Sequence, residues 1–478
     1  MKHVRTGWLL VWLVVSTTAH GEGRNDLPDL GDASSSLISP QMEREIGEDF
    51  LKRVHSALPT VDDPVLKYYV HQQLSNLAQH SELRERVLST VLIDNDQINA
   101  FAAPGGVVGI NLGLMLYAED VHEYSSVIAH ELAHLSQRHF ARGIEEQRSQ
   151  TLPALAAMIA AIMIGVMGGG DAGMAAISSV QAIAQANQLR YSRGREQEAD
   201  RIGLNTLVRA DLDPQGMARM FERMQRAYRF TRKPPEFLLT HPLSETRIAD
   251  AKSHALQYGN VEHPQSSEYQ MMRARAVVHY AKSPQAAVKQ FEKRVRDNPD
   301  SLAARYGLAT ALSADEQHAE AIALNDQLYT TNPRNILYTA SFAEVLIKAG
   351  KIDQALDLLV RELELNPDNP PLAMLYADAL VADSQFEAAE KVLQRQSFVN
   401  KHDVDVWYNL AEISGLAGNI VGVHVARAEF FTLHGAYQRA IQHLEYARRL
   451  TSRSNDQLHA RLDQRITDLR TKLREQRS

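Results

Sequence analysis

A spacing of 34 residues runs through the C-terminal half of the chain. Asn-Pro pairs occupy positions 298–299, 332–333 and 366–367, and Asn400 falls on the next step, where Lys401 replaces the proline. Two sets of alanines keep the same interval: Ala287, Ala321, Ala355 and Ala389, and Ala309, Ala343, Ala377 and Ala411. Small residues let two helices cross closely, and proline stops a helix. Each unit of this length is therefore predicted to fold as a pair of packed helices.

This pattern resembles the tetratricopeptide repeat, and the resemblance implies an α-solenoid over residues 268–478. A general array of α-hairpins is the alternative and predicts nearly the same shape. Trp407 and Leu410 open another first helix, after which we expect the phase to slip: an extra or degenerate helix near 418–431, then a final pair capped by 458–473. Such arrays present concave surfaces that bind proteins or peptides, and this half shows no catalytic constellation.

The composition of the chain excludes several classes of protein. Its 478 residues are 44% hydrophobic and 23% charged, which is typical of globular domains rather than of disordered or many-span membrane proteins. The formal net charge of -7 offers no basic surface to a phosphate backbone, so nucleic acid is not expected as a partner. Because there is no cysteine, disulfides, thiol catalysis and zinc–thiolate sites are excluded, and any metal must be bound by His, Asp or Glu.

The first residues are typical of a secretory signal peptide. Lys2 and Arg5 give a short positive region, an apolar run covers 8–15, and small residues precede a predicted cleavage after Ala19. A transmembrane anchor is the alternative, but the run is about half of the ~20 apolar residues that a span requires. We therefore expect a signal peptide over 1–19 and a soluble mature protein in an extracytoplasmic compartment, the bacterial periplasm.

The first half of the mature chain, over 20–262, is predicted to be a separate domain with few strands. Ser39 and Pro40 indicate the start of a helix to about His55, and a second helix follows Pro64. A β-rich run at 87–93 and two apolar stretches around Pro104 within 101–110 predict a small strand and hairpin unit. Its edge could receive an extended peptide by backbone pairing, or the unit could be plain core sheet.

A His-Glu-x-x-His motif lies in a helical segment with apolar flanks. His130 and His134 share one helix face and can aim their rings at one metal ion, while Glu131 lies about 100° around the helix. Two histidines, a carboxylate and a water around zinc make a hydrolytic site in which Glu131 removes the proton of the attacking water. Two surface histidines of a helix are the alternative without metal.

A second acidic motif supplies candidates for the third ligand. Glu196 and Asp200 are four residues apart on one face of a helix that is predicted to continue to about Leu207. One of these carboxylates can bind the metal while the other accepts the free N–H of a ligand histidine. Glu198 points elsewhere and is expected to be solvated, or paired with Arg195 or Arg201.

The two motifs together resemble the zinc metallopeptidase family that includes the CAAX prenyl proteases and HtpX. The resemblance rests on His-Glu-x-x-His, on Glu-x-x-Ala-Asp at 196–200 after Ser192 and Arg193, and on the segments 99–101 and 104–106. It implies a zincin-type, gluzincin-like α+β peptidase domain that binds one Zn²⁺, with Glu196 as third ligand and Asp200 as the supporting catalytic carboxylate.

His241 stands in a less distinctive context than the other candidates. A lone histidine before proline is usually an ordinary loop residue, but the family resemblance puts it at the active-site cleft, as a regulatory fourth ligand that silences the enzyme or assists the transition state. Arg247 is expected to pair with an acid rather than to stabilise an oxyanion. His122 and His139 fall off the ligand face and are expected to have structural roles.

The longest apolar stretch of the mature chain covers 152–167 and is predicted to be a buried or interfacial helix, with peripheral membrane contact as the alternative. Taken whole, the sequence predicts a mainly α-helical zinc metalloendopeptidase with a repeat domain. Resemblance to periplasmic relatives that carry repeats implies degradation of stalled or misassembled outer-membrane proteins and chaperone-like help to barrel assembly. It further implies the β-barrel assembly machinery and the lipopolysaccharide-transport barrel as partners. The alternative is a chaperone or scaffold with a vestigial or latent metal site.

Overall fold

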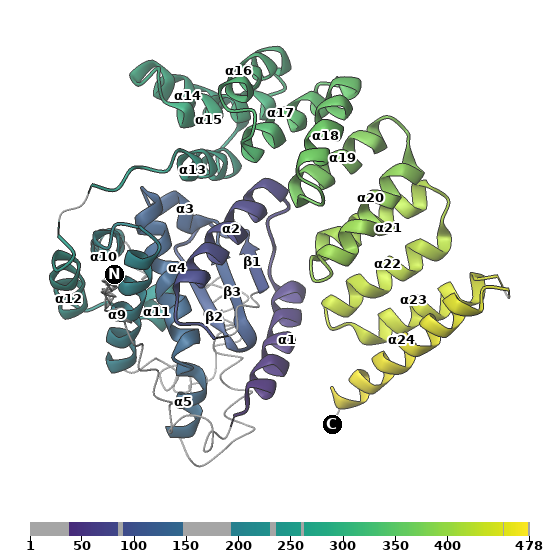
Figure 1. Cartoon of the computed structure of the whole chain (residues 1–478), viewed down its shortest axis with the longest axis horizontal. Helices are drawn as coiled ribbons and strands as arrows, with labels where there is room; N and C mark the ends of the chain where they lie inside the picture. Colours follow the sequence, from purple (N-terminus) through teal and green to yellow (C-terminus); the bar gives the residue numbers. More distant parts are fainter. Residues whose placement is uncertain are drawn as a thin grey trace, which may run out of the picture. The chain divides into compact units, whose positions relative to one another are not determined.

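The computed structural model describes residues 38–84, 89–146, 193–229, 236–259, 262–452 and 454–476. These ranges fold mainly as α-helices with one three-stranded sheet, as predicted (Figure 1). The predicted signal peptide at 1–19 and the apolar segment at 152–167 lie outside the described residues. Among the helices that are described, none combines the length and apolarity needed to cross a bilayer.

The helices before the repeats begin where local capping chemistry predicts. They are α1 (Pro40–Ala57), α2 (Pro64–His80), α3 (Gly113–Tyr117), α4 (Val121–Ser136), α5 (His139–Glu146), α9 (Arg193–Arg209), α10 (Gln215–Arg229), α11 (Glu236–Thr240) and α12 (Glu245–Leu256). Ser39 caps α1 by accepting a hydrogen bond from the Met42 amide, and Asp63 caps α2 in the same way. Both predicted starts, at Pro40 and Pro64, are confirmed.

The sheet has the order β1-β3-β2, from β1 (Ser89–Ile93), β2 (Ala100–Ala103) and β3 (Val107–Asn111). β3 pairs parallel with β1 and antiparallel with β2, so the predicted hairpin is confirmed. The turn between β2 and β3 depends on Gly105 and Gly106, whose φ values of 74° and 79° favour glycine. Gly109 is needed for packing, because a Cβ atom there would lie 2.1 Å from the Phe101 ring.

The second half is a series of helical hairpins. Its helices are α13 (Ser267–His279), α14 (Pro284–Asp297), α15 (Leu302–Ala314), α16 (His318–Thr331), α17 (Ile336–Lys348), α18 (Ile352–Leu365), α19 (Pro370–Ala382), α20 (Phe386–Val399), α21 (Val404–Leu416), α22 (Ile420–Leu433), α23 (Tyr437–Leu450) and α24 (Asp456–Glu475). Four hairpins close on a residue with positive φ at a constant interval: Glu316, Gly350, Ser384 and Gly418. The 34-residue period is thus also a period of backbone conformation.

A helix lies near 418–431, where an extra or degenerate one was expected. This helix, α22, is not degenerate, because it has 14 residues and begins at Ile420, 34 residues after α20 begins at Phe386. The interval changes one helix later, since α23 begins at Tyr437, only 33 residues after α21 begins at Val404. Gly435 in the intervening turn has a φ of 69°, like the glycines of the regular hairpins, which explains why the sequence suggested an early slip.

The two halves share one hydrophobic core. Buried residues of α2, α4, α13, α17 and α19 belong to the same cluster, and the Tyr269 hydroxyl donates to the Ala118 carbonyl at 2.9 Å. Arg275 of α13, which is buried, pairs with both Asp63 at the start of α2 and Glu344 of α17. The first helices of the array are therefore packed against the first half of the chain by apolar and charged side chains alike.

Candidate active site

The His-Glu-x-x-His motif lies near the end of α4, a helix whose residues are almost all buried. Asp120 caps this helix by accepting from the Glu123 amide at 2.8 Å. α9 crosses α4 closely at Gly203, where a Cβ atom would lie 3.0 Å from the His130 amide nitrogen. The absence of a side chain at Gly203 therefore brings the acidic motif of α9 up to the histidines of α4.

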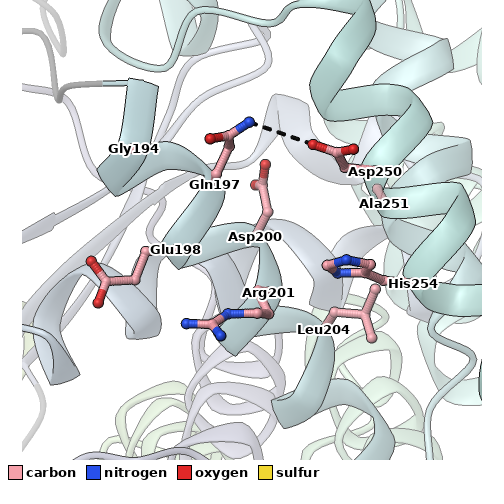
Figure 2. Close-up of a pocket in the computed structure, with 9 residues that line it drawn as sticks. All are labelled: Gly194, Gln197, Glu198, Asp200, Arg201, Leu204, Asp250, Ala251 and His254. Atoms are coloured by element: carbon pink, nitrogen blue, oxygen red, sulfur yellow. Dashed lines mark hydrogen bonds between the residues drawn. The ribbon is translucent and has the colours of Figure 1, made fainter.

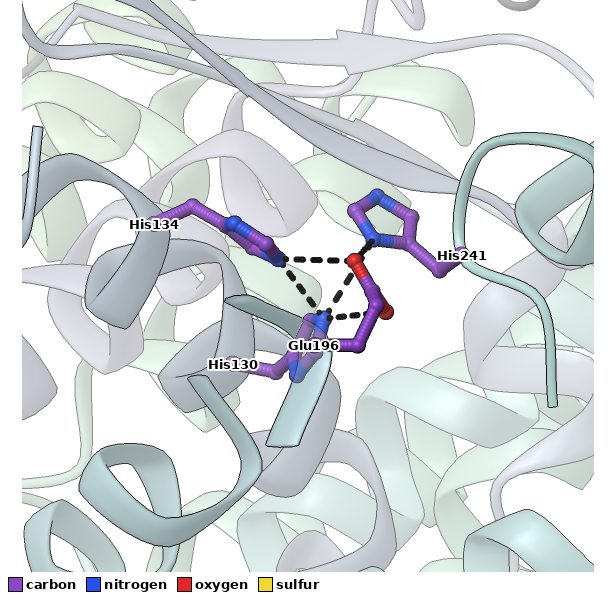
Figure 3. A group of neighbouring side chains, drawn as sticks. All are labelled: His130, His134, Glu196 and His241. Atoms are coloured by element: carbon purple, nitrogen blue, oxygen red, sulfur yellow. Dashed lines mark hydrogen bonds and ion pairs between the residues drawn. The ribbon is translucent and has the colours of Figure 1, made fainter. Parts of the chain in front are cut away.

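Four buried side chains converge from three elements: His130 and His134 from α4, Glu196 from α9, and His241 directly after α11 (Figure 3). One potential ligand atom from each lies within 4.8 Å of the others. His134 Nε2 is 3.0 Å from His130 Nε2, and His241 Nδ1 is 3.1 Å from Glu196 Oε1. None of the four is more than 3% exposed. The structure thus brings together residues that the sequence separates by more than one hundred positions.

This donor set fits a metal ion. Three ring nitrogens and a carboxylate oxygen point at one another, and the ring nitrogens of His130 and His241 are also only 3.3 Å apart. Each neutral imidazole offers one lone pair, and lone pairs that converge in a buried space need a cation or a proton between them. Burial also lowers the pKa of His134 well below its ordinary value, with help from His130 and His241, which keeps this ring in the neutral form that ligates metal.

Asp200 and Arg247 support the cluster from behind. Asp200 Oδ1 lies 2.9 Å from His130 Nδ1, on the side of the ring that faces away from the cluster. Arg247 of α12 holds the same carboxylate with two bonds of 2.7 Å and reaches Glu196 Oε2 at 2.7 Å. Burial opposes ionisation of Asp200, but hydrogen bonds from Arg247 and His130 outweigh it and lower its pKa. The expectation that Arg247 pairs with an acid is confirmed.

Glu131 is placed beside the cluster rather than in it. Its Oε1 atom is 3.5 Å from His241 Nε2, and its carboxylate accepts from the Ala102 amide of β2. The side chain is 1% exposed, and burial raises the pKa of Glu131 despite the opposing effect of His241 and His130. A carboxylate with a raised pKa next to a metal-binding group is suited to accept and return a proton.

His241 is not the ordinary loop residue that its sequence context favours. It is 2% exposed, and its ring stacks on Phe237 of α11 with a centroid distance of 4.7 Å and an interplanar angle of 26°. Burial opposes its charged form, yet the carboxylates of Glu196 and Glu131 outweigh burial and raise the pKa of His241. The backbone thus places His241 at the cluster, as the family resemblance implied.

The surroundings of the cluster contain contacts that the sequence did not suggest. Glu198, which is 26% exposed, pairs with His139 and Arg142, both at 3.1 Å. His139 lies outside the four clustered residues, as expected, and its Nδ1 lies 2.8 Å from His134 Nδ1. The helical face of α4 does not extend to His139, since α4 ends at Ser136 and Arg138 adopts a φ of 49°. His122 keeps a structural role: its Nδ1 accepts from the Asp213 amide at 3.2 Å.

A pocket of about 370 Å³ lies between α9 and α12 (Figure 2). Its lining includes Glu198 and Asp200, the two carboxylates that contact His139 and His130, together with Asp250 of α12. Figure 2 shows Gln197 reaching across this space to Asp250, with a bond of 3.4 Å. None of the four clustered residues lines this pocket, so it is distinct from the metal-binding group.

Comparison with known sequences places both halves of the chain. Residues 64–255 match peptidase family M48, and residues 272–336 and 346–413 match tetratricopeptide repeats. The solved structure of a thermophilic tetratricopeptide repeat protein from Thermus thermophilus covers 43% of this chain and 98% of its own at 16% identity, with a TM-score of 0.29. The M48 match contains the whole cluster, including Glu131, Asp200 and Arg247.

Similar proteins span the full arrangement. The chain is 32% identical to the putative beta-barrel assembly-enhancing protease of Vibrio cholerae, over 98% of either sequence. It is 31% identical to the beta-barrel assembly-enhancing protease of Escherichia coli, over 95% of this chain and 93% of that one. The mitochondrial metalloendopeptidase OMA1 of Schizosaccharomyces pombe matches 44% of this chain and 60% of its own at 28% identity. The chain is therefore a metalloprotease of peptidase family M48 and belongs with the beta-barrel assembly-enhancing proteases.

Proposed function

We propose that the chain is a zinc metalloendopeptidase in which His130, His134 and Glu196 bind one Zn²⁺. The convergence of these side chains within 4.8 Å, in a buried group without thiolates, carries the proposal. Two histidines and a carboxylate with an open fourth position are a common donor set of catalytic zinc. When bound, zinc would polarise the peptide carbonyl and make a water acidic.

The protein's own groups supply the proton transfers. Glu131 takes the proton of the water that attacks the peptide carbonyl and later gives it to the leaving amine. Asp200 accepts the Nδ1 hydrogen of His130, which leaves the Nε2 lone pair of that ring free for the metal. Arg247 contacts both Asp200 and Glu196, and its positive charge offsets part of the negative charge of these two carboxylates. This helps a third carboxylate, that of Glu131, to be tolerated in the same buried volume.

His241 is proposed to regulate this site. Its Nδ1 is as close to Glu196 as a ligand of the same ion would be, and its Nε2 faces Glu131. Occupying the fourth position, His241 would exclude the substrate water and hold the enzyme silent until it swings out. We expect His241→Ala to increase basal cleavage or to leave a metal-bound enzyme with altered turnover. Unchanged cleavage of an unfolded client would remove this role.

The client proteins and the cellular location of the chain are also proposals, and they rest on its relatives. The name of those relatives refers to β-barrel assembly, so we propose that the chain degrades stalled or misassembled outer-membrane proteins and assists assembly through its repeats. This location requires the predicted signal peptide at 1–19 and export to the periplasm. Partners would be the β-barrel assembly machinery and the lipopolysaccharide-transport barrel, with the segment 152–167 available for peripheral membrane contact.

The division of labour between the halves is also a proposal, with a peptidase domain over 20–262 and a repeat domain over 268–478. A repeat array that binds clients fits the tetratricopeptide matches, since helical arrays present extended binding surfaces. The competing function is a chaperone or scaffold with a latent metal site. It would be favoured if envelope defects are rescued by a catalytically dead chain but not by one lacking 268–478.

Glu131→Gln in the purified protein tests the enzymatic proposal. The amide keeps the shape and the contact with Ala102 but cannot accept a proton, so cleavage of an unfolded outer-membrane protein should fall ~10²–10⁴-fold. Zinc content per chain, measured by atomic absorption, should stay at one, while His130→Ala should lose it. Persistent cleavage by Glu131→Gln at full zinc content would overturn the assignment of the general base.

A further inference from the structure

We propose that His139 and Glu198 form a hydrogen-bonded chain that positions His134 for metal binding; this inference rests on the proposed metal site. Glu198 Oε2 lies 3.1 Å from His139 Nε2, and His139 Nδ1 lies 2.8 Å from His134 Nδ1. His139 is fully buried, whereas the Glu198 side chain is 26% exposed. The chain therefore runs from the protein surface to the ring of a metal ligand.

The metal fixes the direction of every hydrogen in this chain. If His134 ligates through Nε2, its remaining hydrogen is on Nδ1 and is donated to His139 Nδ1, only 2.8 Å away. His139 must then carry its own hydrogen on Nε2, which faces the Glu198 carboxylate. The opposite arrangement would put a hydrogen on His134 Nε2, pointing at His130 Nε2 and blocking the metal position. Only one set of tautomers satisfies all three residues and leaves the site open.

The contact between the two rings is polar rather than a matter of packing. Two nitrogens approach to 2.8 Å only when they share a hydrogen, since this is shorter than their van der Waals separation. The ring centroids are 4.9 Å apart at an angle of 72°, so the rings meet edge to face instead of stacking. An apolar side chain at 139 could fill the same volume but would leave the Nδ1 hydrogen of His134 without this acceptor.

The same helix serves both ligand histidines. Asp200 Oδ1 lies 2.9 Å from His130 Nδ1, and Glu198 acts on His134 through His139. Glu196 is a proposed ligand itself, so α9 carries alternate carboxylates that hold two ligands and provide the third. Arg142 also contacts Glu198 at 3.1 Å, but its side chain is 45% exposed. Glu198 and His139 are thus positioning residues, and Arg142 is peripheral to them.

The zinc dissociation constant tests this hydrogen-bonded link independently of activity. It is measured by competition for zinc with a chromophoric chelator. His139→Leu removes the acceptor and should raise this constant ~10–100-fold, as loss of a partner behind a metal ligand typically does. His139→Gln should keep it within about threefold, because the amide oxygen can accept from His134 and its NH₂ can donate to Glu198. His122→Leu is the matched control: His122 is a buried histidine of α4 whose loss should leave the zinc affinity unchanged.

Equal zinc affinity in His139→Leu and the unaltered protein would overturn the proposed role of His139 and Glu198. Equal weakening by His139→Leu and His139→Gln would also overturn it, because that result would indicate that His139 acts by packing alone. If His139→Leu does not fold, Glu198→Leu decides, since Glu198 is partly exposed and tolerates an apolar side chain. That variant should weaken zinc binding and Glu198→Gln should not. If the unaltered protein binds no zinc, the proposed function itself is refuted. If it binds zinc normally and the variants bind zinc equally well, only the hydrogen-bonded link from Glu198 through His139 to His134 is refuted.

Discussion

The metal-binding region and the exposed faces of the repeat array handle charge in opposite ways. Arg247 and Asp200 are 2.7 Å apart with side chains 4% and 10% exposed, and they come from different helices of a crowded interior. Arg448 and Asp463 in the array are also 2.7 Å apart, but both side chains are about half exposed. The same distance therefore has a different meaning in the two regions. An exposed pair of the array has water around each charge, whereas in the site each buried charge depends on its partner.

Replacing Arg247 by Met should give the largest effect on stability. The substitution leaves Asp200 and Glu196 in a buried space without their cation, so the metal-free protein should lose about 3–5 kcal/mol of unfolding free energy. The measurement is urea unfolding at pH 7.5 in the presence of a chelator. Arg448→Met is the matched control and should cause no measurable change, because an exposed pair contributes little. Similar losses from both variants would break the contrast between the regions.

The sequence predicts the repeat array more completely than the metal-binding region, because a sequence pattern reports local structure better than tertiary contacts. Each repeat is specified by residues close together in the sequence, so the alanines and the Asn-Pro pairs predict the helix pairs. Only the position at which the 34-residue interval changes was missed. His130, Glu131 and His134 follow from the geometry of one helix, and Glu196 and Asp200 from another. The choice between those two carboxylates, and the presence of His241, came from the family resemblance.

What could not be predicted depends on tertiary structure. The contact between His139 and His134 exists because Arg138 takes a left-handed conformation and turns the chain back after α4. A helical projection that continues past Ser136 puts His139 on the wrong side. Arg201 and Arg195 are close to Glu198 in sequence, yet Glu198 pairs with residues of α5, which the sequence places more than fifty positions away. Contacts of this kind have no periodic signal.

α1 contacts the array at His55, whose ring centroid lies 6.0 Å from that of His434 after α22. This junction should give the next largest effect, and the effect depends on pH. Burial, followed by the nearby His434, lowers the pKa of His55 to about 4, from an ordinary value of 6.5. The folded state thus disfavours the charged ring, and the unfolded chain binds the extra proton between about pH 6.5 and pH 4. The unfolding free energy has its full value above pH 6.5 and falls as the pH drops through this window, by about 3 kcal/mol in total, of which about 2 kcal/mol is lost by pH 5.

Urea unfolding at pH 7.5 and pH 5 measures this loss. His55→Gln has no proton to gain and should reduce the difference in unfolding free energy between the two pH values. His80→Gln, which changes a partly exposed histidine at the end of α2, should not reduce it. If His55→Gln unfolds with the same pH dependence as the unaltered protein, the junction does not differ from the exposed faces of the array. A dependence of stability on buried ionisable side chains would then not extend to this junction.

The smallest effects should come from the hairpin turns of the array, where the local rule can be tested at matched positions. Gly350 and Ser384 occupy equivalent turns with φ values of 69° and 60°. A left-handed conformation costs a residue with a Cβ atom about 1–2 kcal/mol, and part of this is offset because glycine loses more entropy on folding. Ser384→Gly should therefore raise the unfolding free energy by about 0.5–1 kcal/mol, and Gly350→Ala should lower it by a similar amount. A Cβ atom at Gly350 would meet nothing within 4 Å, so a much larger loss would contradict a purely conformational cause. Zinc affinity and cleavage should be unchanged in both variants, since neither residue belongs to the metal-binding group.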